Sequence, residues 1–151
     1  METKEEENYK DFDELGLYLT IIESVVVSFN PIRTVEFKII RPFGHSESEL
    51  HYQRGVLVFK NVIECSMDIV NDYYEYPEFY RSAVLSNSEN LKAARSKYQQ
   101  HGGKKEVEFM HYYMYIDYGN KESAVDLVCQ SHELVLQSKP KLLTEFEGLN
   151  E

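Results

Sequence analysis

The side chains best suited to chemistry in this chain are five histidines, and their spacing does not assemble a familiar reaction centre. They are His45, His51, His101, His111 and His132. None forms an HxH or HExxH pair, so a metal site would need ligands from separate strands or loops to converge. No GxSxG, P-loop or GxGxxG sequence is present. We therefore assign no catalytic residues and predict that the protein holds no metal ion and no cofactor.

His111 lies in the most aromatic segment, FMHYYMYIDYGN, residues 109–120. On a strand, alternate side chains face opposite sides, so His111, Tyr113 and Tyr115 would share one face. The other face would be apolar and carry Met110, Tyr112, Met114 and Ile116. A structural strand explains the tyrosines, because the ring buries area while the hydroxyl reaches water.

The alternative is a small-ligand or enzyme pocket on this face. It would be lined by His111, Tyr113, Tyr115 and His132. Asp117 or Asp126 could then serve as the carboxylate beside a histidine base, which needs a nucleophile within hydrogen-bond reach.

The stretch NDYYEYPEFY, residues 71–80, interleaves carboxylates with aromatic rings. Aromatic anchors are favoured at protein interfaces, and neighbouring acids would select a basic partner. The candidate binding residues are Tyr73, Tyr74, Glu75, Tyr76, Glu78 and Tyr80. The simpler interpretation is a connection that packs its rings on the domain's own core.

The net charge of −10 narrows the class of partner. Such a chain repels phosphate backbones, so we expect no nucleic-acid binding; a basic protein is the complementary partner. Residues 81–105 reverse the balance with six bases and one acid, which suits either an anion site or a solvated helix face.

The termini and cysteines indicate the compartment. The start, METKEEENYKDFDELG, is not a signal peptide, and no run of 18 apolar residues is present, so we expect a cytoplasmic protein without a membrane partner. Cys65 and Cys129 fall in alternating apolar runs and are predicted to be reduced core thiols. A disulfide between neighbouring strands is the alternative.

The remaining patterns describe a single domain. Residues 1–16 form an acidic N-terminal arm, and residues 17–151 an antiparallel β-rich domain with a helical insert at about 77–102. In that insert Pro77 suits a first helical position, Ser86 and Glu89 have capping-box spacing, and Gly102 and Gly103 end the helix. A tight turn or bulge is expected at Lys60-Asn61.

We predict an α+β, mainly antiparallel β fold: a sandwich or partly open barrel of about six strands with one helical insertion. An exposed edge strand could also build a homodimer.

The runs GVLVFKNVIECSMDIV and HYYMYIDYGNKESAVDLVCQSHELVL resemble parts of small, acidic, β-rich bacterial proteins, through F-x-N-V and a later V-x-L-V-C hairpin. Some of these are immunity proteins, which neutralise a toxin by binding it. The resemblance implies a structural likeness and transfers no site residues. Together these observations favour a binding protein over an enzyme, with a basic protein, such as a toxin, as its partner.

Overall fold

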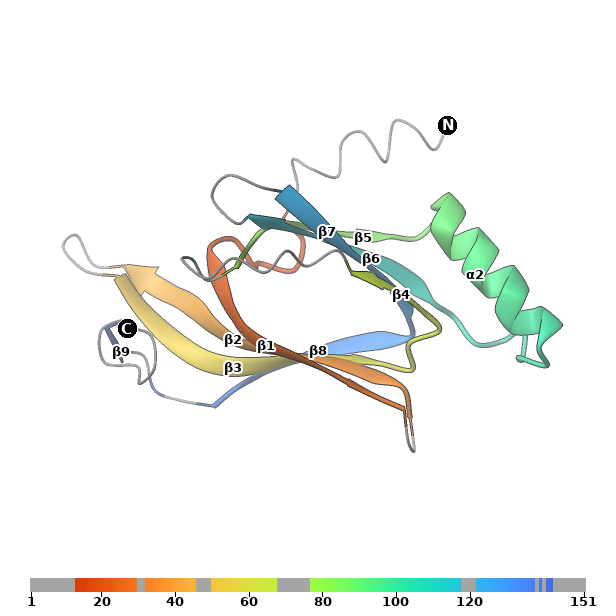
Figure 1. The fold of residues 1–151 in the computed structure, drawn as a ribbon, viewed down its shortest axis with the longest axis horizontal. Coiled ribbons are helices and arrows are strands. Elements are labelled where there is room, and N and C mark those ends of the chain that lie inside the picture. The colour runs from red at the N-terminus through yellow and green to blue at the C-terminus, as the bar shows by residue number, and fades with distance from the viewer. Residues whose placement is uncertain are drawn as a thin grey trace.

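The described part of the chain is one antiparallel β-sheet with a single helix at its end (Figure 1). The computed structural model describes residues 13–29, 32–45, 50–67, 77–117, 122–137, 139 and 141–142. The elements in these residues are β1 (Thr20–Ser28), β2 (Thr34–His45), β3 (Leu50–Lys60), β4 (Glu64–Met67), β5 (Glu78–Leu85), α2 (Glu89–Gln100), β6 (Met110–Asp117), β7 (Glu122–Cys129), β8 (Ser131–Leu136) and β9 (Lys141–Leu142). The mainly antiparallel β fold with one helix is confirmed; the described residues contain nine strands rather than about six.

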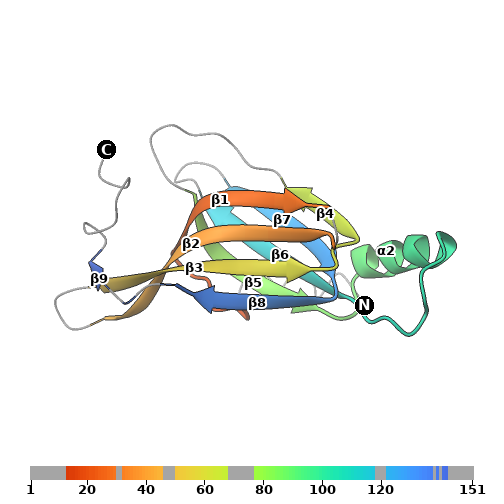
Figure 2. The ribbon, with the colours of Figure 1, turned by 90° about the horizontal axis from the view of Figure 1, so that it is seen from below.

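The sheet bends into two halves that lie over one another (Figure 2). Its strand order is β4-β7-β6-β5-β1-β2-β3-β8, with β9 beside β3. The halves join where β1 meets β5, through the short pairing of Thr20 with Phe79 and Ile21 with Glu78. The sheet is not closed into a barrel.

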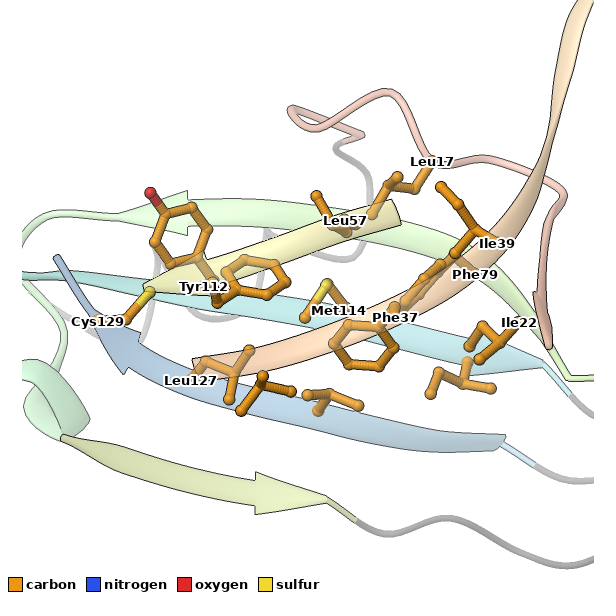
Figure 3. Close-up of a cluster of buried hydrophobic side chains, with 14 of the residues drawn as sticks. Leu17, Ile22, Phe37, Ile39, Leu57, Phe79, Tyr112, Met114, Leu127 and Cys129 are labelled. Atoms are coloured by element: carbon orange, nitrogen blue, oxygen red, sulfur yellow. The ribbon is translucent and has the colours of Figure 1, made fainter. Parts of the chain in front are cut away.

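The core fills the space between the two halves (Figure 3). Phe37 of β2 packs edge-to-face on Phe59 of β3, at 6.0 Å between ring centroids, and on Phe79 of β5, at 5.3 Å. Such edge-to-face contacts add to the burial of the rings. The predicted apolar face of β6 is confirmed, because Tyr112, Met114 and Ile116 lie in this core and Met110 packs against it.

Two short connections lie side by side where the chain passes between the two halves. One joins β3 to β4 through residues 61–63, and the other joins β7 to β8 through Gln130. Asn61 has a φ of 54°, a left-handed conformation that asparagine tolerates better than most residues. Its amide donates to the side-chain oxygen of Gln130 at 2.9 Å, and the Gln130 N–H bonds to the Lys60 carbonyl. The turn predicted at Lys60-Asn61 is therefore confirmed.

The predicted helical insert at about 77–102 is half wrong. Pro77 precedes a strand, because residues 78–85 pair along β6 as β5. The helix begins later, and its N-cap is Ser88, whose hydroxyl accepts the Leu91 N–H at 3.1 Å. Ser86 is exposed and is not the cap. Gly102, with a φ of +91°, follows the helix as predicted.

The predicted acidic arm of residues 1–16 contacts the domain at its C-terminal end. Residues 1–12 lie outside the described residues, but Asp13 forms a bridge with Ser82 of β5. One Asp13 carboxylate oxygen accepts the Ser82 hydroxyl and the Leu17 N–H, each at 2.8 Å. These bonds dock residues 13–16 on the domain, so this segment is part of the fold.

Candidate functional site

The predicted acidic, aromatic stretch is described only at its end. Tyr73, Tyr74, Glu75 and Tyr76 lie outside the described residues. Glu78 and Tyr80 lie on β5, where both are half-buried.

Tyr80 belongs to an aromatic cluster that also contains Tyr115. The sequence predicts Tyr80 in the acidic binding stretch and Tyr115 in the alternative pocket. The Tyr80 ring lies 5.3 Å from that of Tyr18 and 6.4 Å from that of Tyr115, between centroids. The Arg81 guanidinium lies 4.3 Å from the Tyr80 ring centroid and 5.2 Å from that of Tyr18. We call Tyr18, Tyr80, Arg81 and Tyr115 the tyrosine patch.

Strand register and the Asp13 loop together build this patch. Arg81 pairs with Tyr115 across β5 and β6, so their side chains are neighbours. Tyr18 comes from the turn before β1, where the second Asp13 carboxylate oxygen accepts its N–H at 3.0 Å. Tyr18 is 45% exposed, and no local sequence pattern marks it as a partner of β5.

His111 lies in a chain of hydrogen bonds that contains the residue types of a hydrolase triad. Its Nδ1 is 2.7 Å from the Ser88 hydroxyl, and its Nε2 is 2.6 Å from the Asp126 carboxylate. With the hydroxyl donating to Nδ1, the ring carries its proton on Nε2 and donates it to Asp126. The arrangement places a carboxylate beside a histidine, as the alternative interpretation required.

This chain of bonds lacks an accessible nucleophile. Ser88 is 2% exposed and its hydroxyl is already the N-cap of α2. His111 is 4% exposed. Nucleophilic catalysis needs the attacking oxygen to reach a substrate, so the three side chains act here as an anchor between the helix and the sheet.

The predicted four-residue pocket is not assembled as one group. His111, Tyr113 and Tyr115 lie on alternate positions of β6, as predicted. His132 of β8 is exposed as a residue, but its ring lies against the core side, where its Nδ1 is 2.9 Å from the Tyr112 hydroxyl. Burial lowers the pKa of His132 and raises that of Tyr112 to about 12.

Two surface hollows adjoin α2, and neither is lined by His111 or Tyr113. The larger, of about 450 Å³, includes Arg33, Lys97 and His101 among its lining residues. The smaller, of about 190 Å³, includes Lys97 and the Asp126 carboxylate. Lys97 of α2 therefore lines both hollows. The negative end of the helix dipole lies at the same turn and disfavours an anion there.

The cysteine prediction is half right. Both thiols are free, and Cys129 is buried. Cys65 is exposed, and it lies on β4, the strand at one end of the sheet that the described residues form. Burial raises the pKa of both thiols, that of Cys129 to about 12.

Within the described ranges, no three His, Cys, Asp or Glu side chains cluster closely enough to hold a metal ion. The helix found in this part of the chain is too short and too polar to cross a bilayer.

Comparison of the chain with models of protein families, with curated proteins and with solved structures found no match. The resemblance to immunity-type proteins therefore stays a prediction.

Proposed function

We propose that this protein is a non-enzymatic binding protein that recognises a basic protein partner through the tyrosine patch and its acidic surroundings. The observation that carries the proposal is the cluster in which the Tyr18 and Tyr80 rings meet edge-on and Arg81 lies over both, with Tyr18 45% exposed. Tyrosine and arginine are the residue types that dominate binding energy at interfaces.

The contacts within the patch support a binding role. Rings that already pack on one another lose little conformational freedom when a partner covers them, and less lost freedom means tighter binding. Arg81 is held by two rings and by a hydrogen bond that it donates to the Tyr80 carbonyl, because a guanidinium is attracted to the negative face of an aromatic ring.

Electrostatics favour a basic partner. The chain carries 26 acids against 16 bases, and complementary charge speeds encounter and selects the partner. Glu78 lies on the patch's own strand, and the Glu14 carboxylate accepts the Val84 N–H farther along β5. The mechanism is occlusion: the rings bury in the partner's surface while carboxylates pair with its lysines and arginines.

The immunity-type role is the finer part of the proposal. It rests on the resemblance and on the chemistry of a cytoplasmic, acidic binder, and its partner would be a basic toxin. The enzyme alternative has less support, because the one Ser-His-Asp arrangement in the described residues buries its hydroxyl.

The test is affinity capture from the native host with three immobilised proteins. They are the wild type, the double variant Tyr18→Ala/Tyr80→Ala, and a control, Val135→Ala/Leu136→Ala. The control truncates two side chains on β8 that are each 42% exposed, close to the 45% of Tyr18. All three should give the same far-UV circular dichroism.

We expect the wild type and the control to capture one basic protein that the double variant loses. Calorimetry with the purified partner should show Kd raised roughly 10- to 100-fold in the double variant. Binding should also weaken with salt. An acidic partner, or equal capture by all three proteins, would sink the proposal.

A further inference from the structure

Among the residues that the structure describes, strand β1 has one unpaired edge along most of its length. Its pairing with β5 is confined to Thr20 and Ile21, with one more bond from the Ile22 N–H to the Pro77 carbonyl. From Ser24 to Ser28 it pairs with β2 on one side only, among the described residues. Figure 2 shows β1 along the outer side of its half, with β2 on its other side.

The open edge is apolar and lacks the usual protection. Val26 is 41% exposed and Val27 42%, and the adjoining turn carries Phe29 at 73% and Ile32 at 54%. Natural edges are usually blunted by charged side chains or proline. Residues 24–29 contain neither, so this segment lacks the side chains that usually block pairing with another strand.

The sequence of this edge reads the same in both directions, so two copies in antiparallel orientation place identical residue types opposite one another. Ser24 to Ser28 reads SVVVS, which is symmetric about Val26. If a second copy pairs antiparallel about a two-fold axis at Val26, Ser24 faces Ser28 of the second copy and Val25 faces its Val27. Val26 then faces itself, and no like charges meet within the paired segment, where they would be destabilising.

We propose that this protein forms a two-fold symmetric homodimer in which β1 pairs with β1 of a second copy, centred on Val26. The pairing is isologous, as closed two-fold interfaces must be, and it continues the sheet from one copy into the other. A second copy fits better than an unrelated strand, because it places serine opposite serine and valine opposite valine along the whole of Ser24 to Ser28. The paired segment is neutral, so the two acidic chains meet where repulsion is least.

The tyrosine patch lies on β5 and β6 and on the turn before β1, away from this axis. The homodimer therefore does not depend on the proposed partner, and each proposal can fail alone. Five paired residues bury less area than a typical stable interface, so we expect a dimer that dissociates on dilution.

The first test is sedimentation of the full chain over a dilution series, with Val26→Lys and Val135→Lys. The two valines are almost equally exposed, at 41% and 42%. Val135 lies on β8, the last strand of the sheet, and Val26 lies on the part of β1 that pairs only with β2 among the described residues. The wild type and Val135→Lys should move from twice 17.8 kDa towards 17.8 kDa on dilution. Val26→Lys should be monomeric throughout, because two ammonium groups would face one another on the axis.

The second test does not depend on weakening the fold. In a Cys65→Ser background, Val26→Cys should form a disulfide-linked dimer under mild oxidation, since directly opposed residues of an antiparallel pair have Cβ atoms close enough to bridge. Val135→Cys in the same background should link far more slowly. A wild type that is monomeric at every concentration, a dimer unaffected by Val26→Lys, or equal linking by the two cysteine variants would each overturn the proposal.

Discussion

Replacing Ser88 by alanine should destabilise the protein more than any other change of one hydroxyl in the helical region. The Ser88 oxygen accepts the Leu91 N–H at 3.1 Å and lies 2.7 Å from Nδ1 of His111. Ser88→Ala therefore removes the N-cap and leaves a buried ring nitrogen without its partner. Both losses fall in a site that is only 2% exposed at Ser88, so water does not replace the hydroxyl.

The size of the effect follows from these two contacts. Loss of a serine N-cap costs about 0.5–2 kcal/mol, and a buried polar group left unpaired costs about 1–3 kcal/mol. The two losses together amount to roughly 1.5–5 kcal/mol of unfolding free energy, a large share of the roughly 5–15 kcal/mol typical of a domain. Urea unfolding followed by far-UV circular dichroism measures it directly.

Ser86→Ala is the matched control, because it makes the same chemical change two residues earlier. Ser86 is exposed, and a surface substitution of this kind should stay within about 0.5 kcal/mol of the wild type. Equal losses in the two variants, or a loss below about 0.5 kcal/mol for Ser88→Ala, would refute the assignment of the cap and of its bond to His111.

Three further changes test other parts of the structure. Folding lowers the pKa of His132 by burial, so the unfolded chain takes up the proton first and stability should fall as pH drops below about 6.5; His132→Gln should flatten that part of the pH profile in urea unfolding, and an unchanged profile would contradict the burial. Gly55→Ala would put a Cβ 2.8 Å from the Val135 carbonyl oxygen, so thermal melts should show a loss of about 1–3 kcal/mol; a neutral result would mean that β3 and β8 are not so close. A thiol reagent should label Cys65 in the native protein and Cys129 only after unfolding; two native reactive thiols would show that Cys129 is accessible.

Local alternation was enough to predict the faces of β6. A strand's two-residue period does not depend on the rest of the fold, so the core side of Tyr112, Met114 and Ile116 could be read directly. The turn at Asn61 and the helix end at Gly102 were equally readable, because both depend on residues that tolerate positive φ.

The features that the sequence did not predict depend on contacts between residues far apart in the chain. Ser86 and Ser88 both precede the helix, and only Ser86 has glutamate at capping-box spacing. Ser88 is the cap because His111, 23 residues away, bonds to its hydroxyl. Tyr18 joins Tyr80 because the Asp13 loop docks on β5, a pairing that no local pattern encodes.

The position of a strand in the sheet determines whether the apolar face of its alternating sequence is buried. Cys65 has the spacing of a core residue, yet it lies on the strand that ends the described sheet, and its side chain is exposed. Alternation shows which side chains share a face, whereas the neighbouring strands determine whether that face is buried.

Accessibility separates the candidate sites of this protein better than residue type does. Ser88, His111 and Asp126 have the residue types and hydrogen bonds of a catalytic relay, but the hydroxyl is closed off by the helix that it caps. The tyrosine patch has no catalytic chemistry, but it reaches solvent. The proposed axis at Val26 lies six residues along β1 from Thr20, roughly 20 Å of extended chain, so a partner on the patch would leave the axis free. A homodimer would then present two patches at a fixed spacing, and a partner with repeated basic surfaces would bind it more tightly than it binds a single chain.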